Sequence, residues 1–437
     1  MGFVIQSYRT CTLKSPRRKA FRMNPFQVTP LFLGTPRLKY LTALMVLSCC
    51  VHFAYARERL PEVVYLQPQW LAYSKKEIQK GGADALRRLE DLIKDADKAL
   101  GKGPYSVVNK TLVPPSGDKH DYMSLGPYWW PNPDKPDGLP YINKDGVVNP
   151  ESTDESTDQR RKSRMCNNVR DLSLAYYFTG EEKYAKHAAL LIRTWFIDPE
   201  TRMNPNLQYA QGIRGRNDGR GIGIIESAAY VKVVDAVGLL KPSHHWTARD
   251  EAAMKAWFKS YLKWMLSHPY GIDESKQHNN HGTYYDMQVV CFALFTGYTS
   301  VARDVLNEVG AKRIKTQIKA DGSQPHELRR TKSFHYSCMN LEGLFDLARM
   351  GDRIGIDLWK VRVGGKPALK TAFEYLIPYA NPSKKWPYKE IKGVRPDLLL
   401  PFISQAYIKY RDKRYLEVLK YCREAASSQE ILWYPLP

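Results

Sequence analysis

The stretch from Gln277 to Asp286 holds two imidazoles, three side-chain amides and two phenols within ten residues. Side chains this polar suit a protein core poorly, because each one buried without a partner costs roughly 1–3 kcal/mol. We therefore expect this stretch, between two helical patterns, to carry chemistry. Asn280 offers hydrogen-bond donors, and His281 beside it is a candidate base, since an imidazole ordinarily titrates near neutral pH.

A second polar cluster, residues 325–337, contributes Arg330 and Tyr336. Together these residue types suit removal of a proton α to a carboxylate, as at C5 of a polymeric uronic acid. Asn and Arg can offset the charge that develops on the carboxylate. His can take the proton and Tyr can protonate the departing oxygen. We expect the arginine to lower the tyrosine pKa from about 10, and the chemistry needs no metal.

Other readings of the same residues stay open. His278 and His281, with His326 and His335 elsewhere, could form a metal site, but no carboxylate or thiolate pattern completes the ligand set. A uronic-acid-specific glycoside hydrolase would need two carboxylates across the scissile bond. The spacing of the available acids favours no pair; these acids are Asp121, Asp286 and Glu327. A non-catalytic glycan-binding protein would leave both clusters without a purpose.

Helical periodicity runs through most of the chain, and strand patterns are scarce. Residues 161–179 and 184–196 form a helical hairpin, with a helix stop and a new start at residues 179–182. Further helices are expected at residues 74–100, 224–240, 248–267, 284–296, 301–320, 340–354, 366–380, 397–410 and 414–426. No fixed repeat persists, so an all-α protein built as an (α/α) toroid of helical hairpins fits better than a solenoid.

Two irregular segments interrupt the helices. Residues 101–157 are rich in Pro, Gly, Asp and aromatic side chains, among them Trp129 and Trp130. These tryptophans suit either a sugar-stacking wall of a cleft or a strap packed over helix ends. Residues 203–223 contain glycines, but no strand precedes them and no Walker lysine follows, so a nucleotide loop is excluded. A polar loop at the cleft, or a solvated connector, is expected instead.

The formal net charge is +21, and residues 57–437 keep 58 basic against 45 acidic residues. Such a chain favours a polyanionic partner. Arg37 and Lys39 precede an apolar run that ends in Ala54-Tyr55-Ala56, the pattern of a secretory signal peptide. We expect a leader at residues 1–56, one catalytic domain at 57–437, and export to the periplasm, with an outer-membrane lipoprotein as the lesser alternative. Nucleic acid is then an unsuitable partner, and no later segment is apolar over ~20 residues.

Four cysteines follow the leader without C-x-x-C spacing, which excludes a zinc ribbon and favours buried free thiols. They are Cys166, Cys291, Cys338 and Cys422.

The combination of motifs resembles the alginate lyase superfamily of polysaccharide lyases, particularly polysaccharide lyase family 38. The motifs are Asn279-Asn280-His281-Gly282, Glu327-Leu328-Arg329-Arg330-Thr331 and Phe334-His335-Tyr336-Ser337. Residues 117–122, 128–131, 167–171 and 203–223 support the likeness, which covers most of the chain after the leader.

The resemblance implies an (α/α) toroid and β-elimination without a cofactor, leaving a 4,5-unsaturated uronate on alginate, polymannuronate or glucuronan. Asn280 and Arg330 would neutralise the carboxylate, and His281 would act as base with Tyr336 as acid. In a syn elimination Tyr336 could serve as both. Arg329 competes with Arg330, which is preferred for its spacing to Tyr336.

Further substrate contacts are expected around these four residues. Asn167 or Asn168 could share the carboxylate. The other candidates, aromatic, basic or amide side chains, are Tyr122, Trp129, Trp130, Gln211, Arg214, His278, Tyr284 and Arg329.

Overall fold

The computed structural model describes residues 60–422 and 428–435, and residues from Leu60 onward form one compact unit. The expected leader lies outside the described residues, so periplasmic export stays a prediction. No helix in the described ranges is both long enough and apolar enough to cross a membrane. The four cysteines that follow the leader are buried free thiols, as expected.

Four helices line the inside of the molecule. They are α4 (Gln159–Thr179), α6 (Tyr230–Leu240), α9 (Asn280–Thr296) and α13 (Ser333–Arg353). They pack in this order, each against the next. Every residue of α6 except Lys232 is buried, which is the signature of a helix surrounded by other elements.

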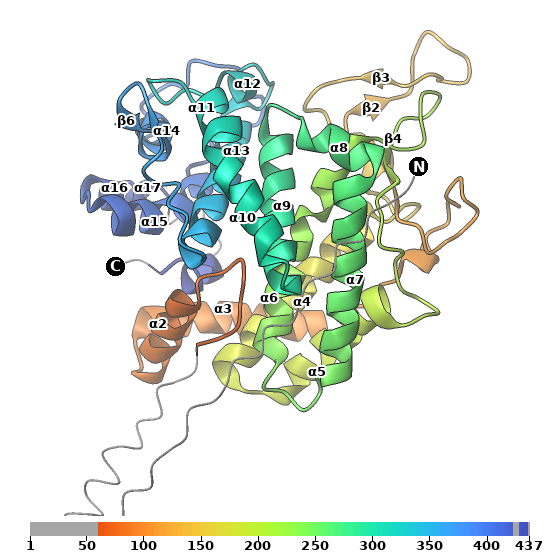
Figure 1. Cartoon of the computed structure of the whole chain (residues 1–437), viewed down its shortest axis with the longest axis horizontal. Helices are drawn as coiled ribbons and strands as arrows, with labels where there is room; N and C mark the ends of the chain where they lie inside the picture. Colours follow the sequence, from red (N-terminus) through yellow and green to blue (C-terminus); the bar gives the residue numbers. More distant parts are fainter. Residues whose placement is uncertain (1–59, 423–427, 436–437) are drawn as a thin grey trace, which may run out of the picture. The chain divides into compact units, whose positions relative to one another are not determined.

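A second set of helices covers the first. α3 (Ala83–Leu100) and α5 (Glu182–Ile192) pack on α4, while α7 (Ala248–Ser267) and α10 (Thr299–Val309) pack on α9 (Figure 1). The remaining helices are α2 (Pro68–Gln79), α8 (Pro269–Ser275), α11 (Lys315–Gln317), α12 (Pro325–Leu328), α14 (Ala368–Leu376), α15 (Leu400–Tyr410), α16 (Arg414–Glu417) and α17 (Leu419–Cys422). The fold is the (α/α) toroid that the sequence predicted.

Helix boundaries follow local signals. α4 ends before Gly180, whose φ of 75° closes the helix, and α5 begins at Glu182, as predicted. α9 begins earlier than predicted, at Asn280 rather than Tyr284, because the Asn279 side chain accepts a hydrogen bond from the backbone N–H of His281. Asn280 and His281 therefore belong to the first turn of a helix rather than to a loop.

Short strands fasten the two irregular segments to each other. β1 (Met123–Leu125) pairs in parallel with β4 (Tyr209–Gly212), with Met123 opposite Tyr209. β2 (Trp129–Trp130) pairs antiparallel with β3 (Ile142–Asn143), and β5 (Arg362–Val363) pairs with β6 (Lys366–Pro367). The segment at 101–157 is thus held against the one at 203–223.

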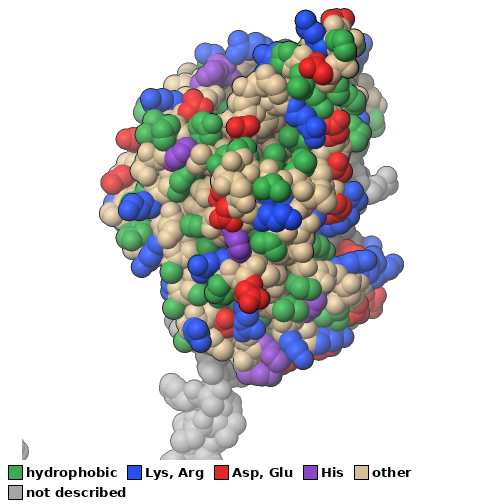
Figure 2. All heavy atoms as spheres, turned by 90° about the vertical axis from the view of Figure 1, so that its right-hand side faces the viewer, with side chains coloured by type: hydrophobic (Ala, Val, Ile, Leu, Met, Phe, Trp, Pro, Cys, Tyr) green, Lys and Arg blue, Asp and Glu red, His purple; other side chains and the backbone are tan. Residues whose placement is uncertain are grey.

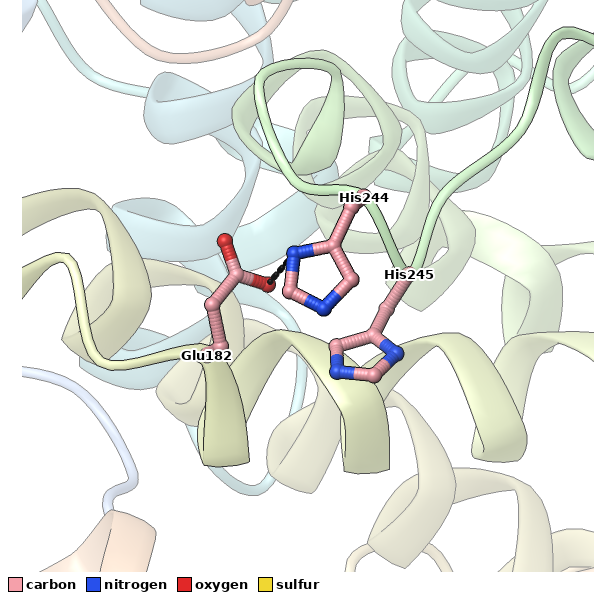
Figure 3. A group of neighbouring side chains, drawn as sticks. All are labelled: Glu182, His244 and His245. Atoms are coloured by element: carbon pink, nitrogen blue, oxygen red, sulfur yellow. Dashed lines mark ion pairs between the residues drawn. The ribbon is translucent and has the colours of Figure 1, made fainter.

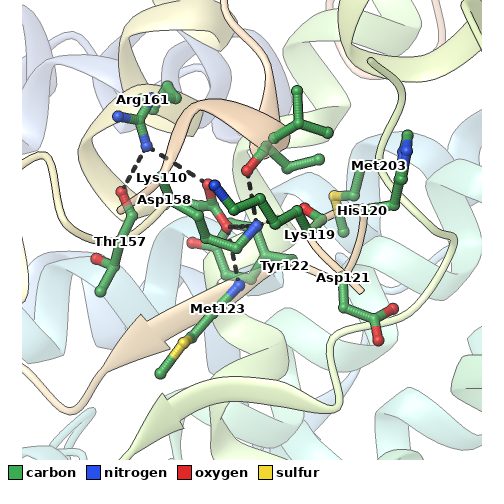
Figure 4. A network of polar contacts seen from close by, with 12 residues as sticks. Lys110, Lys119, His120, Asp121, Tyr122, Met123, Thr157, Asp158, Arg161 and Met203 are labelled. Carbon is green, nitrogen blue, oxygen red and sulfur yellow. Dashed lines mark hydrogen bonds and ion pairs between the residues drawn. The ribbon is translucent and has the colours of Figure 1, made fainter. Parts of the chain in front are cut away.

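A buried ion pair anchors the base of the first segment (Figure 4). The Nζ of Lys110 lies 3.0 Å from Oδ2 of Asp158, and both side chains are fully buried. The same Asp158 oxygen accepts the backbone N–H of Met123, the first residue of β1, at 3.0 Å. Lys110 also donates to the carbonyl oxygens of Val107 and Lys119, both at 2.7 Å. One lysine and one aspartate therefore connect three parts of the segment with the start of α4.

We expect Lys110→Met to destabilise the protein by about 3–5 kcal/mol, because it removes the nearest cation from the buried Asp158 carboxylate and leaves only Arg161, at 3.6 Å. Urea unfolding followed by circular dichroism measures this change. The double variant Lys110→Met/Asp158→Leu should recover part of the loss, since neither charge then remains. A single variant as stable as the wild type would contradict this role of the pair.

Candidate active site

A cavity of about 620 Å³ opens where the N-terminal ends of α9 and α13 meet the irregular segments. It is lined by residues from 125–162, 211–229, 277–281 and 330–339. Asn280, His281, Arg330 and Tyr336 all lie on its wall, so the two polar clusters form one site.

Asn280 is held by a buried carboxylate. Its backbone N–H donates to Oε1 of Glu327 at 2.7 Å, and its Nδ2 donates to Oε2 at 2.8 Å. Burial raises the pKa of Glu327, although the two hydrogen bonds from Asn280 oppose that rise. One Nδ2–H is thus used by Glu327, while the Oδ1 of Asn280 is buried without a partner. The second Nδ2–H can donate to a ligand carboxylate.

His281 is oriented by a second buried carboxylate. Its Nδ1 lies 2.8 Å from Oε1 of Glu274, whose side chain is fully buried. Burial raises the pKa of Glu274, and the nearby His281 partly offsets the rise. A carboxylate at Nδ1 selects the tautomer with the proton on Nδ1, so Nε2 carries the lone pair. That is the form a general base needs.

Arg330 lies against Tyr336, its guanidinium carbon 3.9 Å from the ring centroid. Asp145 fixes the arginine through Nη2 at 2.7 Å and Nε at 3.3 Å. Burial pushes the pKa of Asp145 upward, but the hydrogen bonds from Arg330 and Thr331 outweigh it, so the pKa is lowered. Asp145 is therefore ionised, and its carboxylate holds the Arg330 guanidinium at the cavity.

Tyr336 differs from the expectation of a lowered pKa. Burial raises its pKa well above the usual value, the adjacent Tyr128 adds to the rise, and Arg330 only partly opposes it. The hydroxyl groups of Tyr336 and Tyr128 lie 2.7 Å apart. A protonated phenol in contact with a second phenol is suited to donate a proton.

Comparison with known proteins identifies the family. The alginate lyase family model matches residues 106–386. The chain belongs to the alginate lyase family. No curated protein sequence matches it. The structure is similar to that of an alginate lyase from Bacteroides ovatus, with 36% identity, a TM-score of 0.82, and coverage of 86% of this chain and 100% of the other.

Alginate lyase A1-III from Sphingomonas species A1 shares the fold at 18% identity, with a TM-score of 0.56 and coverage of 86% of this chain and 98% of that one. The protein is a polysaccharide lyase with the (α/α) toroid of its relatives.

Two of the predicted substrate contacts line the cavity of the lyase, Trp129 and Gln211. Two arginines lie over the Trp129 ring, with the guanidinium carbon of Arg216 at 5.2 Å from the ring centroid and that of Arg220 at 5.8 Å. Arg220 donates to the backbone carbonyl and the side-chain oxygen of Gln211. The wall of the cavity is therefore aromatic and basic on this side.

The two amides predicted on α4 lie away from the cavity. Oδ1 of Asn167 accepts from Lys232 at 2.9 Å, and Nδ2 of Asn168 donates to the hydroxyl of Tyr105 at 3.0 Å. Because α4 begins at Gln159, the residues at its cavity end lie two turns before the amides. Gln159 and Lys162 line the cavity in their place.

Other predicted contacts also lie outside it. Tyr122 is fully buried, and its hydroxyl donates to Glu226, which does line the cavity. The indole N–H of Trp130 donates to the carbonyl of Val147, so Trp130 packs as part of the strap whereas Trp129 faces the cavity.

Arg214 borders a separate hollow beside β1 and β4.

Four residues close in sequence to the proposed catalytic residues do not line the cavity. The His278 ring lies 4.4 Å from that of His326, and Nδ1 of His326 accepts a hydrogen bond from Nη2 of Arg329 at 2.7 Å. Tyr284, one turn further along α9 than Asn280, faces the interior.

Three groups in the site were not singled out by the sequence. Tyr128 lies in a quoted motif, but nothing in its spacing points to Tyr336. Asp145 carries no sequence signal, because its partner Arg330 lies 185 residues away. Glu274 lies seven residues before His281 but on a separate helix, α8, so helical spacing does not connect the two. Among the described residues, three metal-ligating side chains gather only at Glu182, which is not part of the cavity.

We expect Glu274→Gln to lower kcat by about ten- to a hundredfold with little change in KM, because the imidazole loses the partner that fixes its tautomer. Steady-state kinetics on a polyuronate measures both constants. Glu308→Gln, an exposed carboxamide substitution on α10, is the control. A Glu274→Gln enzyme with wild-type kcat would show that His281 does not need this carboxylate.

Proposed function

We propose that the lyase cleaves alginate or a related polyuronate by metal-independent β-elimination. The observation that supports this most is the meeting of Asn280, His281, Arg330 and Tyr336 at one cavity from two distant segments. The relative from Bacteroides ovatus, with 36% identity, carries the description alginate lyase, which favours alginate as the substrate. Polymannuronate and glucuronan are the other candidates.

The positive charge needed to hold a uronate is local. On the face drawn in Figure 2, Lys and Arg side chains alternate with acidic and apolar ones and form no single continuous patch. Within the cavity, Lys162, Arg220 and Arg330 line the wall together with the N-terminal end of α9. A carboxylate bound there meets preorganised donors, which stabilise the enolate-like charge that develops during reaction.

In the proposed reaction the substrate carboxylate contacts Asn280 and the edge of Arg330 that Asp145 leaves open. Nε2 of His281 takes the C5 proton, and the electron pair of the C5–H bond forms the C4–C5 double bond. The C4–O4 bond breaks as Tyr336 protonates O4. The products are a 4,5-unsaturated uronate and a shortened chain. Tyr128, in contact with Tyr336, can pass a proton back from solvent.

The raised pKa of Tyr336 favours a reaction with His281 as base and Tyr336 as acid over one in which Tyr336 serves as both. A phenol that stays protonated is available as an acid but must first lose its proton to act as a base. His281, with Nδ1 bonded to Glu274, has its lone pair ready.

A uronic-acid hydrolase is less well supported. Asp286 forms a buried ion pair with Arg313, and Asp121 accepts from Asn204 and Asn206. The remaining carboxylate considered from the sequence, Glu327, is occupied by Asn280. None of the three is free at the cavity to act on a glycosidic bond.

Ultraviolet absorbance of the unsaturated product tests the proposal directly. We expect an increase on alginate in the presence of a chelator, with parallel assays on polymannuronate, polyguluronate, glucuronan and hyaluronan. Tyr336→Phe should lower kcat by at least about a hundredfold and keep substrate binding. Reducing sugar without absorbance would mean hydrolysis. Retained turnover by Tyr336→Phe would contradict its role as acid.

The pH dependence of kcat tests which group is the base. Because the pKa of Tyr336 is raised, its acid form persists to above pH 10, and we expect no loss of kcat from tyrosine ionisation up to about pH 10. Enzyme incubated at each pH and assayed at pH 8 controls for unfolding. A kcat that climbs steadily from pH 8 to pH 10 would instead indicate an ionised tyrosine as base.

A further inference from the structure

Three side chains with metal-ligand chemistry meet far from the cavity in the described fold. Glu182 is the first residue of α5, and His244 and His245 lie in the connection between α6 and α7 (Figure 3). Their donor atoms all lie within 4.8 Å of one another. Nδ1 of His244 is 3.5 Å from Oε2 of Glu182. None of the three borders the catalytic cavity.

The separation of one pair of these atoms, on Glu182 and His244, fits a zinc site. Zinc binds imidazole nitrogen at about 2.0–2.1 Å and carboxylate oxygen at about 2.0–2.2 Å in a tetrahedron, which places neighbouring ligand atoms about 3.3–3.5 Å apart. Glu182 and His244 already stand at that distance. The rings of His244 and His245 have centroids 4.1 Å apart, and the donor atoms of all three residues lie within 4.8 Å, so the His245 donor has to move closer for one ion to bind all three.

The backbone that carries the ligands is fixed by other contacts. Ser243 is buried, and its hydroxyl donates to Oε2 of Glu182, which holds the carboxylate toward the histidines. Nη2 of Arg193 donates to the carbonyl oxygen of His245 at 2.6 Å. Ligands on a fixed turn lose little conformational entropy when a metal binds.

The local charge also favours a cation. The ion pair that Glu182 makes is with His244, and no lysine or arginine of the described chain neutralises it. The side chain of His244 is 70% exposed, so an ion can reach the site from solvent. A carboxylate with two imidazoles is a recurrent zinc ligand set, with water in the fourth position.

We propose that Glu182, His244 and His245 bind one zinc ion that ties the start of α5 to the connection between α6 and α7. The ion adds a link between two helical hairpins and takes no part in the cleavage of polysaccharide.

Isothermal titration with zinc chloride tests the site, using full-length protein purified without a histidine tag and stripped with a chelator. We expect one zinc per chain and a higher Tm with zinc. Glu182→Gln and His244→Ala should each weaken zinc binding at least about tenfold. Glu181→Gln is the matched control, because Glu181 is adjacent in sequence but pairs with Lys183, and it should bind zinc like the wild type.

Each variant is compared with its own zinc-free Tm, so a change in folding is separated from a change in binding. Absence of heat and of a Tm shift in the wild type would overturn the proposal. So would unchanged affinity in both Glu182→Gln and His244→Ala, which would place the zinc elsewhere, for example at His278 and His326. Polysaccharide turnover should be equal with and without zinc, and a loss on chelation would contradict the separation from catalysis.

Discussion

Glu327 on α12 is buried. It accepts both the backbone N–H and the side-chain N–H of Asn280, which lies 47 residues earlier in the chain. This double hydrogen bond connects the first turn of α9 to α12. Arg330 follows α12 directly, and Tyr336 lies in the first turn of α13. One carboxylate thus sets the position of the base, next to Asn280, relative to the arginine and the acid. Losing it would leave buried donors without partners, at a cost of about 1–3 kcal/mol each.

The same arrangement recurs around the cavity, where His281 and Arg330, like Asn280, each have a carboxylate partner on another element. Glu274 orients His281, and Asp145 orients Arg330. Glu274 and Glu327 do not line the cavity, whereas Asp145 lines it and is bonded to Arg330. The toroid makes this possible, because the N-terminal ends of α9 and α13 open on the same side and the strap at 101–157 closes over them. Preorganisation of this kind lets hydrogen bonds and charges act without rearrangement during the reaction.

Much of this could be predicted from the sequence. Residue types and spacing gave Asn280, His281, Arg330 and Tyr336, and helical periodicity with its lack of a fixed repeat gave the toroid. The partners were not predictable, since Asp145 reaches Arg330 across 185 residues and depends on how the strap folds back. Asn167 and Asn168 were expected at the cavity, whereas α4 brings Gln159 and Lys162 to it instead. The direction of the Tyr336 pKa shift depends on burial, which a local motif does not reveal.

A crystal structure of the Tyr336→Phe enzyme with a bound mannuronate oligosaccharide tests the central claim most directly. The account predicts one uronate carboxylate between Asn280 and Arg330, with C5 within about 3.5 Å of Nε2 of His281 and O4 beside the ring at position 336. An oligosaccharide whose C5 faces position 336 instead, or whose carboxylate lies away from Asn280 and Arg330, would contradict it.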